Sequence, residues 1–273
     1  MKADVLSVEG KKLREIELPK QFEAEVDKGV VKRAVLAIQS NARQPQGTMP
    51  RAGRENTAKY RGRRSLPMTE RGINVGRARL PRLNNRRGRL QGMVAGIPRA
   101  VGGPRAHPPK AEANKKQKIN RKEKRAAVDA GIAATAVSEL VGKRHVLDKE
   151  AKLPFVVEKE IEGIEKTKEL RKALNALKVL EDVQNAKEKA RRRAGKGKKR
   201  GRKKKQKISV LIVTGKRASV FRAARNLPGV EVCVARNLNA ELLAPGCEPG
   251  RLVVWSEDAI KEIGAVGKGG ERK

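Results

Sequence analysis

The sequence predicts an α/β domain with an open, mainly parallel sheet, helices on both faces and a long extended internal loop. Two observations carry this prediction. Unbroken apolar runs of strand length alternate with helical stripes in the second half of the chain, a pattern typical of Rossmann-like sheets that are covered on both faces. Residues 43–110, in contrast, have almost no apolar periodicity. We therefore expect a single α/β domain over residues 1–273, with residues 43–110 inserted in it as a loop.

The chain before this loop has the pattern of a strand and a helix. Residues 5–8 form a short apolar strand pattern, and Pro19 marks a turn. Apolar residues then recur at helical spacing from Val31 to Ile38, which predicts a helix over about residues 28–41.

A second helical pattern starts at Asn114, after the loop. Residues 115–125 carry seven basic side chains and one acid, and an alanine-rich run with apolar residues in steps of four continues to Leu140. This predicts one long helix that is basic in its first half and buried in its second. Basic side chains at a helix N-terminus oppose the helix dipole. An anionic partner would relieve that conflict; simple solvation is the alternative.

The remainder of the chain alternates between strands and helices. The strands are expected over residues 153–159, 208–215, 230–235 and 251–256. The helices are expected over residues 170–180, 217–227 and 239–243, and after residue 256. Ser256 is placed to cap the last helix, with acidic residues following in its first turn.

The charge of the chain limits the kinds of partner it can have. The net charge is +36 and the isoelectric point is near 10.9, and such self-repulsion points to nucleic acid, an anionic membrane surface or an acidic partner. No apolar run reaches the roughly 18 residues of a spanning helix. The N-terminus has no continuous apolar stretch of the signal-peptide type. We therefore expect no membrane partner and a cytoplasmic location.

Residues 43–110 contain 15 arginines, two lysines, two acids, ten glycines and eight of the 13 prolines. Such a segment lacks the apolar surface to offset its own chain entropy. Long irregular loops inside compact domains are usually functional. Arginine grips phosphates with a planar fork of donors, and a loop of this length could reach at most about 110 Å. We expect a polyanion to order it.

A second basic run occupies residues 191–207, with 12 basic residues of 17 and no acid. Two basic loops in one domain suggest a single large anionic surface that is touched at several places. A disordered solubility segment or a localisation signal is the alternative.

The sequence offers no nucleotide-binding or catalytic motif. The loop after the third predicted strand, residues 213–219, lacks the G-x-G-x-x-G pattern that admits a pyrophosphate. It also lacks the P-loop pattern, because residue 210, where its first glycine would stand, is Val210. We therefore expect a plain strand-to-helix turn, no cofactor and no catalytic residue.

Metal binding is not expected either. Cys233 and Cys247 have no second cysteine pair and no nearby histidine, whereas a metal site needs three or four converging ligands. His107 and His145 are expected to be structural residues or RNA contacts.

Several segments carry a resemblance to a known family. They are QSNARQPQGT at residues 39–48, GINVGRARLPRL at 72–83, IPRAVGGPRAHPPK at 97–110, AAVDAGIAATA at 126–136 and ARNLNAELLAPGCEPGRLVVWSEDAI at 235–260. In this order they resemble the archaeal form of large-subunit ribosomal protein four. The resemblance covers nearly the whole chain, and the HPPK and LAPG…PGRL segments are its most specific pieces.

The resemblance implies a non-enzymatic subunit of the ribosome. Its α/β domain would lie on the outside of the large subunit, its loop would run into the rRNA, and the loop tip would line the nascent-peptide exit tunnel. Large-subunit rRNA, neighbouring large-subunit proteins and the nascent peptide would be its partners. The expected tunnel-lining residues are Gly76, Arg77, Ala78 and Arg79.

The expected rRNA contacts are arginines and lysines from the two basic loops and from the start of the helix between them. They are Arg51, Arg54, Arg61, Arg63, Arg64, Arg71, Arg82, Arg86, Arg87, Arg89, Arg99, Arg105, Lys110, Lys115, Lys116, Arg121, Arg192, Lys199, Arg200 and Arg202. Two alternatives stay open at this point: an RNA- or nucleotide-modifying enzyme that uses the crevice of a doubly wound sheet, and a sequence-independent nucleic-acid packager.

Overall fold

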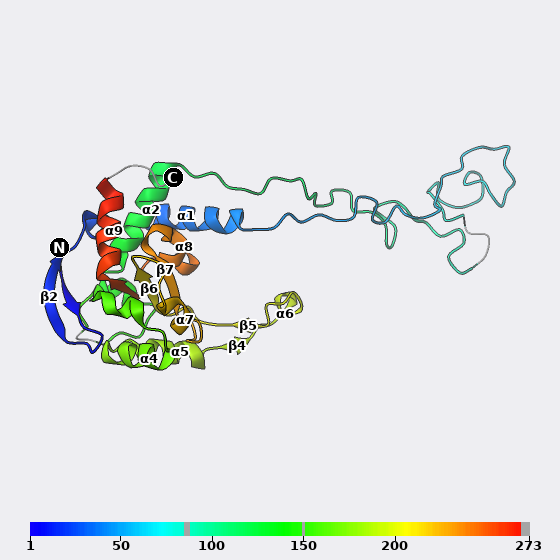
Figure 1. The fold of residues 1–273 in the computed structure, drawn as a ribbon. Helices are drawn as coiled ribbons and strands as arrows, with labels where there is room; N and C mark the ends of the chain where they lie inside the picture. The colour runs from blue at the N-terminus through cyan, green and yellow to red at the C-terminus, as the bar shows by residue number, and fades with distance from the viewer. Residues whose placement is uncertain (85–87, 149–150, 269–273) are drawn as a thin grey trace. The chain divides into compact units, whose positions relative to one another are not determined.

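The computed structural model describes residues 1–84, 88–148 and 151–268 (Figure 1). The chain divides into two compact units, one formed by Met1–Asn41 with Gln117–Lys273 and the other by Ala42–Lys116. We call the first the α/β unit and the second the arm. The sheet and the helices belong to the α/β unit.

The α/β unit is built around one six-stranded sheet. Its strands are β1 Lys2–Leu6, β2 Lys12–Glu17, β3 Phe155–Val157, β6 Leu211–Thr214, β7 Glu231–Val234 and β8 Val253–Ser256. Their order in the sheet is β2-β1-β3-β8-β6-β7. β1 and β2 pair antiparallel, and every other neighbouring pair is parallel. The last strand in the chain, β8, therefore completes the middle of the sheet.

Helices follow the strands in sequence. They are α1 Lys28–Asn41, α2 Arg121–Ala134, α3 Ser138–Gly142, α4 Thr167–Ala176, α5 Leu180–Glu188, α7 Val220–Ala224, α8 Ala240–Leu243 and α9 Glu257–Lys268. The short 3-10 helices are η1 Lys20–Glu23, η2 Lys159–Gly163, η3 Ala235–Asn237 and η4 Pro245–Cys247.

Successive side chains of the central strands enter two separate cores. Val213 and Trp255 pack with α2 and α9 on one face of the sheet. Ile212 and Val254, their neighbours in sequence, pack with α4, α5 and α7 on the other face. Because both faces are covered, the strands need apolar side chains at every position, which explains their unbroken apolar sequence.

A third cluster joins α1, α2 and α8 through small side chains, among them Ala34, Ala127 and Ala240. Gly131 of α2 faces α8, where a Cβ atom would lie 3.0 Å from the Cβ atom of Leu243. Small residues at this contact let the three helices approach closely. The cluster thereby fixes α1 and α2, the two helices next to the arm in the sequence.

The predicted fold class is confirmed: the sheet is mainly parallel, and helices pack on both of its faces. All four strands predicted in the second half of the chain exist as β3, β6, β7 and β8. The helix predicted over residues 28–41 is α1. Ser256 caps α9 as expected, because its Oγ accepts a hydrogen bond from the Ala259 amide at 3.1 Å.

Two predictions near the N-terminus and after the arm were wrong in their bounds. The strand expected at residues 5–8 lies at Lys2–Leu6, and its partner β2 was not predicted, because β2 is polar and largely exposed. The helix expected from Asn114 begins at Arg121. Residues 115–120 stay irregular, and Arg121 and Lys122 stand in the first turn of α2, where their charge opposes the helix dipole.

Three helices were also predicted as too long, and the one expected over residues 217–227 is α7, which spans only Val220–Ala224. α2 ends at Ala134, and Leu140 belongs to the separate helix α3. The leucine stripe at residues 170–180 spans parts of α4 and α5 rather than one helix. Lys178 has a φ angle of 56° between them, a left-handed conformation that a continuous right-handed helix cannot contain.

Candidate nucleic-acid interface

The outgoing and returning segments of the arm are joined by backbone contacts. The Thr48 amide donates to the Pro109 carbonyl at 3.1 Å, which places the HPPK segment against the outgoing chain. A Cβ atom on Gly53 would overlap the backbone of Gly103 and Pro104. Gly53 also has a φ angle of 78°, so only glycine suits this crossing.

The arm is organised without a hydrophobic core. None of the three core clusters of the described residues includes a residue between 42 and 116. Its apolar side chains include exposed ones, such as Met49, Met68 and Val101. Turns, glycine crossings and side-chain hydrogen bonds to backbone carbonyls give the arm its form.

Most of the predicted rRNA contacts are exposed. These residues are Arg51, Arg54, Arg63, Arg64, Arg89, Arg99, Arg105, Lys110, Lys115, Lys116, Arg121, Arg192, Lys199, Arg200 and Arg202. Arg61, Arg71 and Arg82 are half-buried. Arg86 and Arg87 lie outside the described residues.

The half-buried arginines hold the arm's own chain. Arg82 donates from its guanidinium to the carbonyls of Gly92 at 2.9 Å and Ala78 at 3.2 Å. Arg61 pairs with Glu70 at 2.6 Å. Sequence reasoning treated these side chains as RNA contacts only, because residue spacing does not reveal their partners within the arm.

The predicted tip, residues 76–79, presents two exposed guanidinium groups. Arg77 and Arg79 are exposed, and Arg77 reaches back over Gly92, where a Cβ atom would lie 3.5 Å from a guanidinium nitrogen. Gly76 has a φ angle of 66° with open space around it, and Ala78 accepts the hydrogen bond from Arg82. Arg82 therefore supports the backbone of the tip from within the arm.

Asn41, the last residue of α1, joins the two chain segments at the arm's attachment. Its Oδ1 accepts a hydrogen bond from the Gln117 amide at 3.0 Å, and its Nδ2 donates to the Gln117 carbonyl at 3.3 Å. The side-chain amide of Asn41 thus bonds to both backbone groups of Gln117, as a backbone amide does in a β-bridge. A salt bridge of 2.8 Å between Arg33 and Glu123 also links α1 to α2.

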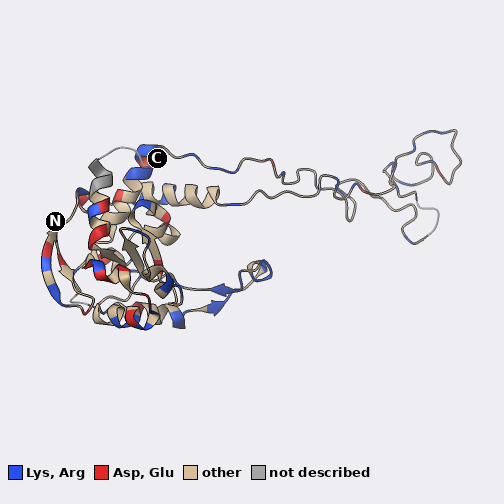
Figure 2. Ribbon diagram, in the orientation of Figure 1, with Lys and Arg blue, Asp and Glu red and all other residues tan. Residues whose placement is uncertain are grey.

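The second basic run forms a short two-stranded hairpin, with β4 Arg191–Arg192, α6 Lys196–Lys199 and β5 Lys204–Lys205. We call residues 191–207 the basic hairpin (Figure 2). Its pairing places Arg191 opposite Lys205 and Arg192 opposite Lys204. Like charges directly opposite destabilise a strand pair, so a polyanion bound here would relieve a repulsion built into the hairpin.

A buried carboxylate, Asp182 of α5, holds the end of the basic hairpin. It pairs with Lys207 at 2.8 Å, and it accepts hydrogen bonds from the Ser209 hydroxyl at 2.5 Å and from the Val146 amide at 3.1 Å. The side chain of His145 is fully buried beside it, with Nδ1 2.8 Å away. The hairpin therefore enters the fold through a fixed polar junction.

The pKa values at this junction keep Asp182 charged and His145 neutral. Burial alone would raise the pKa of Asp182, but hydrogen bonds from His145, Lys207 and Ser209 outweigh it and hold that pKa well below its usual range. Burial lowers the pKa of His145, and the hydrogen bond to Asp182 opposes this only in part. Neutral His145 thus donates from Nδ1 to the ionised carboxylate of Asp182. Its burial fits the expectation of a structural histidine.

Positive charge is concentrated outside the folded core. Residues 43–110, 115–125 and 191–207 together hold 36 of the 66 lysines and arginines and only three of the 30 acids. The other residues hold 30 basic and 27 acidic side chains. The α/β framework is thus nearly balanced in charge, and the segments without an apolar core carry almost all of the excess.

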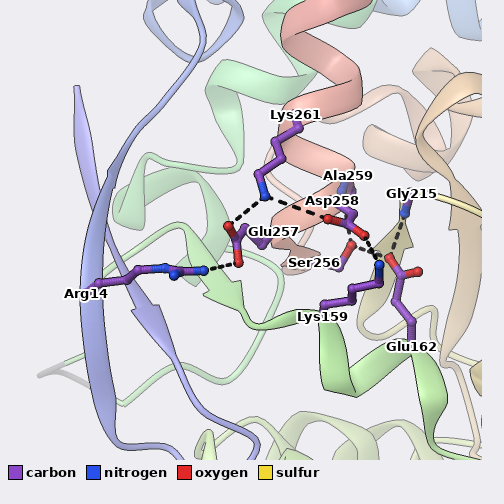
Figure 3. A network of polar contacts seen from close by, with 9 residues as sticks. All are labelled: Arg14, Lys159, Glu162, Gly215, Ser256, Glu257, Asp258, Ala259 and Lys261. Atoms are coloured by element: carbon purple, nitrogen blue, oxygen red, sulfur yellow. Dashed lines mark hydrogen bonds and ion pairs between the residues drawn. The ribbon is translucent and has the colours of Figure 1, made fainter.

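The crevice in which doubly wound sheets bind anions is filled by the protein itself. β6 and β8 are neighbours, and the helices that follow them, α7 and α9, pack on opposite faces, which is the topology of a ligand crevice. Buried Glu162 occupies it (Figure 3). Its Oε1 accepts hydrogen bonds from the Gly215 amide at 2.8 Å and the Ser256 hydroxyl at 2.6 Å.

The acids at the start of α9 are likewise paired (Figure 3). Glu257 contacts Arg14 at 2.5 Å and Lys261 at 2.8 Å, and Asp258 contacts Lys159 at 3.2 Å. The donors that could bind a phosphate in this crevice thus donate to the carboxylate of Glu162 instead. Glu257 and Asp258 form ion pairs with nearby lysines and an arginine.

No group of three or more metal-ligating side chains occurs in the described ranges. Cys233 and Cys247 are free thiols, and burial raises the pKa of the Cys233 thiol to about 11. Among the helices that the structure describes, none is long and apolar enough to cross a membrane.

This architecture defines a class of strongly basic α/β protein whose ligand crevice is filled by its own side chains. The Ribosomal protein L4/L1 family matches residues 16–266. Large ribosomal subunit protein uL4 of Archaeoglobus fulgidus is 46% identical over 97% of this chain and 98% of that protein. The proteins of the same description from Methanococcoides burtonii and Halobacterium salinarum are 45% and 41% identical, over 96% of this chain and 97% and 99% of their own lengths.

The chain belongs to the Ribosomal protein L4/L1 family. It is a structural constituent of the large ribosomal subunit, without enzymatic activity, and its place is the cytoplasmic ribosome. The resemblance to the archaeal form is confirmed. Neither the RNA- or nucleotide-modifying enzyme nor the sequence-independent packager fits this membership.

Sequence reasoning missed the polar residues that organise the α/β unit. Arg251 of the PGRL segment is buried and donates to the Ser209 carbonyl at 3.0 Å and to Glu231 at 2.6 Å. Asp182 and Glu162 were not singled out from the sequence. Their partners lie far away in sequence, so no local pattern could have found them.

Replacing Glu162 tests its role in the crevice. Glu162→Ala leaves two buried donors without an acceptor, which should cost about 1 to 3 kcal/mol of unfolding free energy. Glu162→Gln keeps an acceptor oxygen and should cost less. Urea unfolding is followed by the fluorescence of Trp255, the one tryptophan. Exposed Glu160→Ala is the control and should change little; equal losses in Glu160→Ala and Glu162→Ala would contradict the role.

The lowered pKa of His145 predicts a pH dependence of stability. Below about pH 6.5 the unfolded state takes up a proton that the folded state resists. The wild type should therefore lose stability between pH 7 and 5. His145→Asn, which keeps a nitrogen donor toward Asp182, should flatten that slope. Asp182 does not contribute there, because its stabilisation is lost only below about pH 4.

The other histidine supplies the control for this pH experiment. His107 is exposed in the arm, so His107→Asn should keep the wild-type slope of unfolding free energy against pH. Equal slopes in the wild type and in His145→Asn would show that His145 does not resist protonation.

Proposed function

We propose that the chain binds large-subunit rRNA through the arm and the basic hairpin, supports assembly of the subunit, and places residues 76–79 at the wall of the nascent-peptide exit tunnel. Neighbouring large-subunit proteins and the nascent peptide are its further partners. The observation that carries the proposal is the concentration of positive charge in segments that have no apolar core.

The form of the contact follows from the side chains. Neutralisation of phosphates by Lys and Arg supplies most of the affinity of basic proteins for nucleic acid. The arm offers exposed arginines on a glycine-rich backbone, which suits close approach to RNA helices. The rest of the α/β unit, outside the basic hairpin and the start of α2, is nearly balanced in charge and adds an anchor. Both basic segments, residues 43–110 and 191–207, are thus proposed to bind the rRNA.

A deletion that respects the arm's own geometry tests this proposal. Gly53 and Gly103 lie against each other, so residues 54–102 can be removed and Gly53 joined to Gly103. The deletion removes no residue of a core cluster. The unfolding free energy should change by less than about 1 kcal/mol, whereas incorporation into reconstituted large subunits should be largely lost.

Two further variants serve as a charge control for the deletion and as a test of the tunnel placement. Alanine at Lys168, Arg171 and Lys172, exposed cations of α4, should leave incorporation unchanged. Arg77→Ala with Arg79→Ala should assemble but lose crosslinks between the tip and a nascent peptide. Normal incorporation of the deletion protein would refute the assembly role, and unchanged nascent-chain crosslinks would refute the tunnel placement.

A further inference from the structure

A hollow of about 330 Å³ opens beside the base of the basic hairpin. Residues 206–208, which lead from the hairpin into β6, line one side of it, and residues 225–231, which lead from α7 into β7, line the other. Small-molecule sites span about 300 to 1,000 Å³. The hollow is therefore at the small end of this range, where a single nucleotide would fit.

The walls of the hollow are fixed by backbone contacts. The Ser209 amide donates to the Gly229 carbonyl at 2.8 Å, and the Glu231 amide donates to the Val210 carbonyl at 3.0 Å. Gly229 has a φ angle of 76°, and a Cβ atom there would lie 2.6 Å from the carbonyl oxygen of Lys207. Glycine thus lets the two walls approach each other, and the hollow exists before any ligand arrives.

Polar and apolar groups are both present in this lining. Gln206, Arg225 and Asn226 are exposed, and their side chains make no hydrogen bond or ion pair with any other described residue. Leu227 and Pro228 are half-buried and offer apolar surface. The hollow thus combines an uncommitted guanidinium, two uncommitted amides and an apolar wall.

Two other charged groups of the lining are already committed. The Lys207 ammonium pairs with Asp182 at 2.8 Å, and the Glu231 carboxylate pairs with Arg251 at 2.6 Å. Arg225 is therefore the cation in the lining that is available to an incoming phosphate.

We propose that this hollow receives one unpaired nucleotide of the rRNA bound by the basic hairpin. Arg225 would hold its phosphate, the amides of Asn226 and Gln206 would meet the base edge, and Leu227 with Pro228 would contact the base face. Proteins read RNA mainly at unpaired bases, because the bases of a duplex are inaccessible in its deep groove. The inference rests on the proposed rRNA binding and adds a base-contacting site to it.

Nucleotide titration of the isotopically labelled full chain tests the site. The probes are the four nucleoside 5′-monophosphates, with inorganic phosphate as the comparison, and amide chemical shifts are the readout. At least one nucleotide should cause saturable shifts at residues 206–208 and 225–231, at concentrations about tenfold below those that phosphate requires, a difference of about 1.4 kcal/mol. Equal responses to phosphate and to every nucleotide would overturn the site.

A double variant and a matched control complete the test. Arg225→Ala with Asn226→Ala should weaken nucleotide binding about tenfold. Arg222→Ala removes an exposed cation of α7 that does not line the hollow and should bind as the wild type does. Equal affinities of the double variant and the wild type would reject the site. Trp255 fluorescence verifies that each variant is folded.

Binding of the wild type to large-subunit rRNA, measured in parallel, separates this inference from the proposed function. If rRNA binds but nucleotides do not occupy the hollow, the inference fails and the proposed function stands. If rRNA does not bind, the proposed function fails as well.

Discussion

Mutual repulsion among basic side chains is the constraint on which the rest of this structure depends. A net charge of +36 spread evenly over the chain would destabilise a compact core through self-repulsion. Here the excess lies in the arm, in the irregular segment before α2 and the start of that helix, and in the basic hairpin. The remaining residues are almost balanced, so the sheet and its two cores form without strong electrostatic opposition.

The junctions between charged segments and core follow from the same constraint. Asn41 bonds to both backbone groups of Gln117 where the arm begins and ends. Asp182 remains ionised and fixes Lys207 at the base of the basic hairpin. Glu162 closes the crevice at the carboxyl ends of β6 and β8. These side chains let a sheet of a kind that often carries nucleotide chemistry serve as a support.

Apolar patterning predicted the framework but not its polar junctions. The strands β3, β6 and β8 could be predicted because burial on both faces requires unbroken apolar sequence. The half-buried edge strand β7 could be predicted from its short apolar run. β2 could not, since an exposed polar strand has no such pattern. The basic composition of the arm predicted that most of its arginines would be exposed, and they are. The hydrogen bonds of Arg82 depend on carbonyls that turns of the arm bring near it, which composition does not show. Asp182 and Glu162 act through partners distant in sequence, which residue spacing does not reveal.

We infer that the arm, the start of α2 and the basic hairpin, rather than the sheet and its packed helices, supply the affinity for RNA. The most direct measurement is the salt dependence of binding to large-subunit rRNA, with excess unrelated duplex RNA present. The full chain is compared with a chain that lacks residues 54–102 and carries alanine at Arg192, Lys199, Arg200 and Arg202. Each lost phosphate contact should reduce the slope of log affinity against log salt by about 0.7 to 0.9. We expect a much shallower slope and weak binding for the altered chain; equal slopes and affinities would show that these segments do not supply the affinity.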